Sequence, residues 1–153
     1  MSLSMRALSD ESEIRDLLYR YARGVDFRDP ELMYGCFADD ARIDLLGIAV
    51  FEGVQAFRAF RPAPGQVLDL ESIDASTHLM GNILVRIDGD DAHAETSAVA
   101  YLYGPRAGAR VVLVRGLQYS DDLRRTDAGW RISARVQRVH WMFEAPALEP
   151  RRG

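Results

Sequence analysis

Four consecutive segments with strand character, joined by short turn sequences, constrain the fold of this chain more than any other feature. They span roughly 78–88, 92–103, 110–123 and 129–142, and they are rich in Val, Ile, Leu and Tyr. The connections between them contain Gly, Asp and Pro, as hairpin turns do. Strands joined this closely pair in antiparallel fashion. The second half of the chain is therefore predicted to form one antiparallel sheet.

The first half of the chain carries helical patterns instead. Apolar residues recur at helical spacing over residues 11–25, after a capping-box sequence that begins at Asp10. Asp29, followed by proline, predicts the start of a short second helix. A strand over 41–46 and a third helical pattern over 54–60 follow. Helices followed by hairpins predict an α+β fold, with the antiparallel sheet curling round the helical layer.

A chain of 153 residues is expected to form one domain with a single core. Residues 61–77 contain two prolines and few periodic apolar positions, which predicts a long surface loop or a lid over a binding site. The C-terminal residues from Pro146 have little to bury and are expected to be frayed.

Charge and cysteine content exclude several classes of function. The formal net charge is -4 and the chain has no lysine, whereas a nucleic-acid surface needs clustered cations. Cys36 is the only cysteine, so no intramolecular disulfide can form, and a reducing cytoplasm is expected. No segment approaches the roughly 20 apolar residues of a membrane span. We therefore expect a cytoplasmic protein without nucleic-acid or membrane partners.

Asp26 stands where the apolar stripe of the first helix ends, beside Tyr21. A carboxylate is unfavourable near the C-terminal end of a helix, where the helix dipole is negative. Residues that break such a local rule are often functional. Asp26 is therefore either a functional acid or a turn residue that caps solvated backbone.

His78 opens an apolar strand at the point where the proline-rich loop enters the sheet. Sites often form at the mouths of sheets, so His78 is a candidate catalytic base. It is equally a candidate core histidine whose ring bonds to a backbone carbonyl. Alternation places Met80 on the same face as His78, and Leu84 with them.

Arg135 lies among apolar neighbours on the last strand, on the same side as Trp141 if no bulge intervenes. Its guanidinium either pairs with a carboxylate, holds an anionic substrate group, or lies on an exposed face. His140 and Trp141 either line a cavity or pack in the core. No histidines have the spacing of metal ligands, and there is no glycine-rich phosphate loop or serine-hydrolase elbow. Neither a metal nor another cofactor is expected.

Five short motifs follow one another along the chain: Glu13-Ile14-Arg15-Asp16-Leu17-Leu18, Tyr21-Ala22-Arg23-Gly24-Val25-Asp26, Phe37-Ala38-Asp39-Asp40-Ala41, Thr77-His78-Leu79 and Gly129-Trp130-Arg131-Ile132. Taken together, these motifs resemble those of the SnoaL-like branch of the NTF2-like superfamily. The resemblance covers about residues 8–143 as a single domain and leaves 144–153 as a flexible C-terminal tail. The resemblance implies a cone-shaped, strongly curved antiparallel sheet over three helices, with an internal pocket.

The resemblance also implies a chemistry. Dehydratases and a dehydrochlorinase of this superfamily use an aspartate at the end of the first helix and a histidine at the start of a strand, where Asp26 and His78 stand. A bile-acid dehydratase adds a tyrosine and an arginine, which correspond to Tyr21 and Arg135. We therefore expect a cofactor-independent lyase or isomerase, dehydratase-like, that acts on a small hydrophobic carbonyl compound such as a polyketide or steroid.

In this interpretation His78 is the general base, Asp26 orients it, Tyr21 donates a hydrogen bond to the substrate, and Arg135 anchors Asp26 or a substrate anion. The substrate pocket is expected to include Met80, Tyr101, His140 and Trp141. The alternative is a non-catalytic protein of the same fold, such as a ligand-binding module or the small subunit of a ring-hydroxylating dioxygenase. A homodimer or homotrimer is expected in either case.

Overall fold

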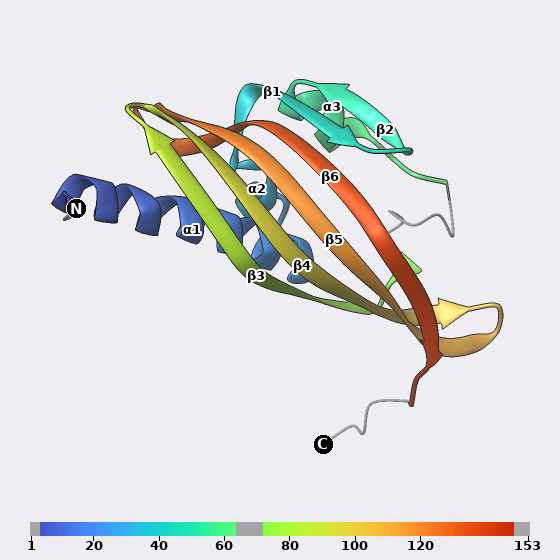
Figure 1. Ribbon diagram of the computed structural model, residues 1–153. Coiled ribbons are helices and arrows are strands. Elements are labelled where there is room, and N and C mark those ends of the chain that lie inside the picture. The colour runs from blue at the N-terminus through green and yellow to red at the C-terminus, as the bar shows by residue number, and fades with distance from the viewer. Residues whose placement is uncertain (1–3, 64–71, 149–153) are drawn as a thin grey trace.

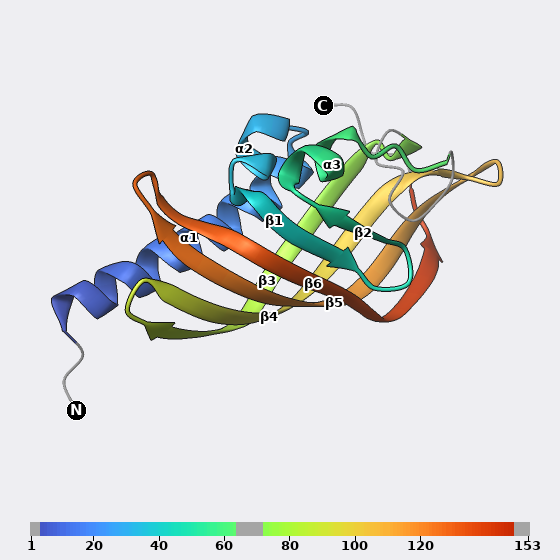
Figure 2. The same ribbon diagram turned by 90° about the horizontal axis from the view of Figure 1, so that it is seen from above.

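The computed structural model describes residues 4–63 and 72–148, in which three helices lie against a curved sheet of six strands. The sheet order is β2-β1-β6-β5-β4-β3. The four long strands at one side of it bend over α1, while α2 and α3 lie toward the β1–β2 side (Figures 1 and 2). This arrangement confirms the predicted α+β fold. Within the described residues, no helix is long and apolar enough to cross a membrane.

Helix α1 runs over Met5–Asp26 and buries Ile14, Leu17 and Leu18 completely. It begins before the predicted start because its N-cap is Ser4, whose hydroxyl accepts a hydrogen bond from the Ala7 amide. The prediction of a capping box at Asp10 is wrong.

Asp10 lies inside α1 and is buried. It accepts a hydrogen bond from the Trp130 indole and forms an ion pair with Arg125 at 2.7 Å. The carboxylate thus fastens the helix to the sheet, a tertiary role that the local sequence pattern does not distinguish from capping.

Helix α2, Pro30–Tyr34, begins where predicted, with Asp29 capping the Leu32 amide. Helix α3 covers Val54–Ala59 and follows Gly53, whose φ of +89° suits glycine. Two short strands, β1 (Phe37–Leu45) and β2 (Ala49–Glu52), form the hairpin before it, and β2 was not predicted.

The long strands are β3 (Ala75–Asp88), β4 (Asp91–Arg106), β5 (Ala109–Thr126) and β6 (Gly129–Pro146). They pair in antiparallel fashion as predicted, whereas β1 pairs with β6 in parallel. Strand β6 also continues past the predicted domain boundary at residue 143.

Bulges interrupt the alternation of two long strands. In β3 the register shifts between Gly81 and Leu84, where Asn82 has a φ of +47°. As a result Ile83 is buried and Leu84 is exposed, so the prediction that Leu84 shares the face of His78 is wrong. In β6 the register shifts at His140, which reverses the side chains beyond it.

Candidate functional site

Asp26 and His78 form a hydrogen-bonded pair between the end of α1 and the start of β3. Asp26 Oδ1 lies 2.6 Å from Nδ1 of the imidazole, and Oδ2 accepts the backbone N–H of His78 at 2.7 Å. The His78 side chain is 4% exposed and the Asp26 side chain 14%. The contact predicted between these two residues, 52 positions apart in the chain, is therefore present.

The hydrogen bonds to Asp26 decide its charge. Burial alone would raise the pKa of Asp26, but hydrogen bonds from the ring and backbone of His78 and from Ser76 bring the pKa below its ordinary value. Asp26 is therefore ionised at neutral pH and holds a proton on Nδ1 of His78. In that tautomer Nε2 is the basic nitrogen, and no described residue forms a hydrogen bond with it.

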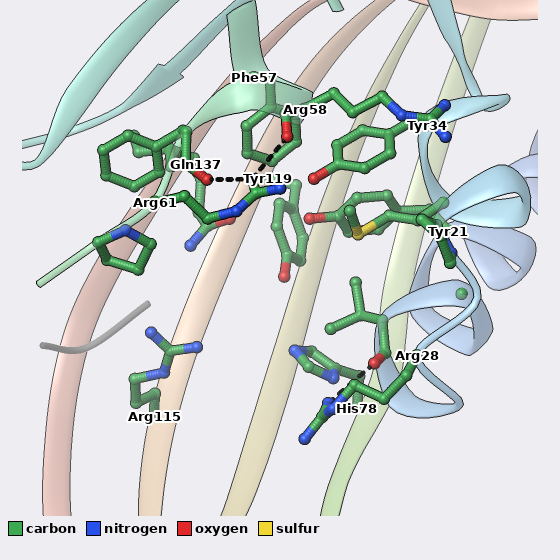
Figure 3. Close-up of a pocket in the computed structure, with 17 residues that line it drawn as sticks. Tyr21, Arg28, Tyr34, Phe57, Arg58, Arg61, His78, Arg115, Tyr119 and Gln137 are labelled. Atoms are coloured by element: carbon green, nitrogen blue, oxygen red, sulfur yellow. Dashed lines mark hydrogen bonds between the residues drawn. The ribbon is translucent and has the colours of Figure 1, made fainter. Parts of the chain in front are cut away.

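His78 opens on a pocket of about 520 Å³ between the helices and the concave face of the sheet (Figure 3). This volume is in the range of small-molecule sites, roughly 300–1,000 Å³. Its walls are mainly apolar and aromatic, and polar groups reach it from several elements. The described lining residues are Tyr21, Gly24, Val25, Arg28, Pro30, Met33, Tyr34, Leu45, Phe57, Arg58, Phe60, Arg61, Pro62, His78, Arg115, Tyr119 and Gln137.

Tyr21 lies on the pocket wall as predicted, with its ring packed edge-on against Phe37 and Tyr119. Burial raises the pKa of Tyr21, and the positive charge of nearby Arg135 only partly offsets that rise. The phenol is therefore protonated at neutral pH and can donate a hydrogen bond into the pocket.

Arg135 lies away from the pocket lining and from Asp26, contrary to the prediction. It forms a bidentate ion pair with Asp121 on the adjacent strand. Nε donates to Oδ1 at 2.6 Å and Nη2 donates to Oδ2 at 2.7 Å, and both side chains are at most 1% exposed. Its guanidinium also lies 4.0 Å from the ring centre of Tyr21 and 4.5 Å from that of Tyr119. Of the three roles considered for Arg135, pairing with a carboxylate is therefore correct, but the partner is Asp121.

The other four residues predicted to line the substrate pocket, Met80, Tyr101, His140 and Trp141, are not among its described lining residues. Met80 points inward, but it packs against the hydrophobic core. Tyr101 occupies an outward position of β4 and is 38% exposed. His140 is exposed and hydrogen-bonds to Gln118, and Trp141 is half-exposed because the bulge at His140 turns it to the outer face.

Several lining residues were not predicted. Tyr119 and Gln137 occupy inward positions of β5 and β6, with the same parity as Asp121 and Arg135. A polar residue at a buried parity within a long strand was the signal that could have identified them. The proposed lid over residues 61–77 falls partly outside the described residues, at 64–71, and its first two residues line the pocket.

Comparisons with known proteins agree with this architecture. A sequence model of the SnoaL-like domain matches residues 6–136. An uncharacterized protein from Mycobacterium tuberculosis is 36% identical over 138 residues, which are 88% of each chain.

Solved structures of the same fold are also similar. A hexachlorocyclohexane dehydrochlorinase from Novosphingobium barchaimii superposes with a TM-score of 0.77 at 16% identity, covering 95% of this chain and 97% of that chain. An NTF2-like protein with a cystatin-like fold from Novosphingobium aromaticivorans gives a TM-score of 0.70 at 28% identity, covering 89% and 85% of the two chains.

Proposed function

The chain belongs to the SnoaL-like domain family, and on that premise we propose that it is a cofactor-independent lyase or isomerase acting on a small hydrophobic carbonyl compound. The observation that carries the proposal is the Asp26–His78 hydrogen bond beside a largely apolar pocket. The same observation favours an enzyme over a non-catalytic binding or structural subunit, because a ligand-binding pocket does not require a base aligned by a buried acid.

In the proposed reaction, Nε2 of His78 removes a proton from the carbon next to the substrate carbonyl. The electrons of that C–H bond move into an enolate, which Tyr21 stabilises by donating a hydrogen bond to its oxygen. In a dehydration, the enolate expels a β-hydroxyl group, and the imidazolium returns the proton so that water leaves. In an isomerisation, the proton returns to another carbon.

Asp26 makes this proton transfer possible in a buried position. Burial disfavours a charged imidazolium, whereas a carboxylate at 2.6 Å from Nδ1 stabilises it. The ionised state of Asp26 also fixes the tautomer in which Nε2 can accept a proton. Arg135 has no direct part in the proposed reaction, since its charge is paired with Asp121.

The test is to compare the wild type with His78→Ala on a panel of enolisable hydrophobic ketones and β-hydroxy carbonyl compounds. Turnover is read from the ultraviolet absorbance of the conjugated product and from exchange of the α-proton in heavy water. General base catalysis contributes about 10²–10⁴ in rate, so His78→Ala should lose about that factor while remaining folded.

The matched control is His140→Ala, which removes an exposed histidine outside the pocket and should retain full activity. If His78→Ala processes every compound as fast as the wild type does, His78 is not the base and the proposal is wrong.

We also propose that the protein is a homodimer or homotrimer. Leu79, Trp141 and Phe143 are each at least half-exposed on the described surface, and association would cover them. Light scattering coupled to size-exclusion chromatography measures the mass directly, and a monomer at micromolar concentration would contradict this expectation.

A further inference from the structure

The described lining of the pocket is cationic although the protein is acidic. Arg28, Arg58, Arg61 and Arg115 line it, and none of the described lining residues is Asp or Glu. The whole chain nevertheless has a net charge of -4. A cleft lined by one sign of charge with apolar walls concentrates ligands of the opposite sign. The pocket is therefore electrostatically suited to an anion.

Arg61 has a guanidinium that backbone carbonyls hold in place while part of it stays available for a ligand. Its Nη1 donates to the backbone carbonyls of Arg58 and Phe60, both at 2.8 Å, which fixes the guanidinium at the end of α3. No described residue accepts a hydrogen bond from its Nε or Nη2. Those two nitrogens form one edge of the guanidinium, and such an edge matches the two oxygens of a carboxylate.

Arg58 and Arg28 are more fully engaged by the protein than Arg61 is. Arg58 forms an ion pair with Glu31. Arg28 donates from Nη1 to Val25 and Ser76 and from Nη2 to the Ile73 carbonyl. These bonds tie the end of α1 to the start of β3, so Arg28 is chiefly a clamp beside the Asp26–His78 pair, and its charge adds to the field in the pocket.

The candidate base and the candidate anion-binding arginine lie at different ends of the pocket. Figure 3 shows His78 and Arg28 toward one end of the pocket and Arg58 and Arg61 toward the other. Tyr34 and Phe57, which pack edge-on against each other, are among the apolar and aromatic residues that line the pocket with them. A ligand that reaches both ends therefore needs an apolar body with an acidic group remote from its reacting carbon.

We infer that the substrate is an amphiphilic carboxylic acid whose carboxylate binds Arg61 and whose reactive carbonyl segment lies at His78. This inference rests on the proposed function for the site of reaction, but the recognition of the acid does not depend on turnover. Arg61 is thus a specificity-determining residue for an acidic substrate.

The experiment measures binding of two matched probes by isothermal titration calorimetry. The probes are 6-oxo-6-phenylhexanoate and its neutral primary amide, which share a ketone and an apolar body. An exposed ion pair contributes up to about fivefold in affinity, so the acid should bind the wild type about fivefold more tightly than the amide. Raising the salt concentration from about 0.05 to 0.5 M should weaken binding of the acid only.

Arg61→Gln should lower affinity for the acid about fivefold and leave affinity for the amide within about twofold. The matched control is Arg138→Gln, which removes an exposed arginine outside the pocket lining and should bind both probes as the wild type does. The inference is wrong if the wild type binds acid and amide equally, if it binds neither at millimolar concentration, or if Arg138→Gln weakens binding of the acid as much as Arg61→Gln.

Binding by His78→Ala separates this inference from the proposed function. A preference for the acid that survives in His78→Ala supports the Arg61 site even if no compound is turned over. Conversely, equal turnover of acid and amide by the wild type would support the lyase and overturn the acid-binding role of Arg61.

Discussion

Replacing Arg135 with methionine should destabilise the protein strongly, because it leaves the carboxyl group of Asp121 without its ion-pair partner and with no exposure to solvent. Removing one partner of a buried ion pair costs about 3–5 kcal/mol, and Asp121→Leu should cost a similar amount by leaving the guanidinium unpaired. Exposed pairs are worth far less, so Arg106→Met, which breaks a half-exposed pair with Glu144, should cost at most about 1 kcal/mol.

The double variant Asp121→Leu/Arg135→Met tests the cause of this loss. It removes both charges, and replacing a buried pair by apolar side chains of similar size is often neutral or stabilising. We therefore expect its free energy of unfolding to lie within about 2 kcal/mol of the wild type. Urea unfolding followed by the fluorescence of buried Trp130 measures all four variants. If the double variant loses the sum of the two single losses, the two charges do not compensate each other and the reasoning is refuted.

Two further predictions concern α1. Gly24→Ala should cost about 1–3 kcal/mol of unfolding free energy despite the helix propensity of alanine, because the added Cβ would lie 2.6 Å from the backbone nitrogen of Met33. The control is Gly81→Ala, whose added Cβ would meet nothing closer than 3.8 Å. Equal losses of the two variants in denaturant unfolding would contradict a specific close approach at Gly24. The pKa of Asp26 is lower in the folded protein than its unfolded value of about 3.9, so its stabilisation is complete above that pH and is lost as the pH falls through the folded pKa. Asp26→Asn should therefore show a shallower loss of unfolding free energy below about pH 4 than the wild type, and parallel curves would show that the carboxylate is not stabilised in the folded state.

The general architecture could be predicted from sequence because local patterns specify it. Helical periodicity predicted α1, the Asp29-Pro30 start predicted α2, and turn sequences predicted the long antiparallel strands. The Asp26–His78 contact followed from a family resemblance, since no local rule brings two residues together across 52 positions.

Several of the errors in side-chain placement share one physical origin, which is side-chain parity. Strands expose alternate residues only while their register holds, and a single bulge reverses everything beyond it. The bulges near Asn82 and at His140 therefore misplaced Leu84 and Trp141. Arg135 was misassigned for a related reason, because its partner Asp121 is a cross-strand neighbour that only the register of β5 and β6 identifies.

Asp26 forms hydrogen bonds with both the ring and the main chain of His78, and these two bonds affect how the substrate range of such a protein can change in evolution. The two bonds hold the end of α1 against β3, so they resist any displacement of the helix that would separate acid and base. The opposite end of the pocket, where Arg58 and Arg61 lie, takes no part in these two bonds. Substitutions at that end of the pocket can therefore change which molecules bind while the Asp26–His78 pair stays the same.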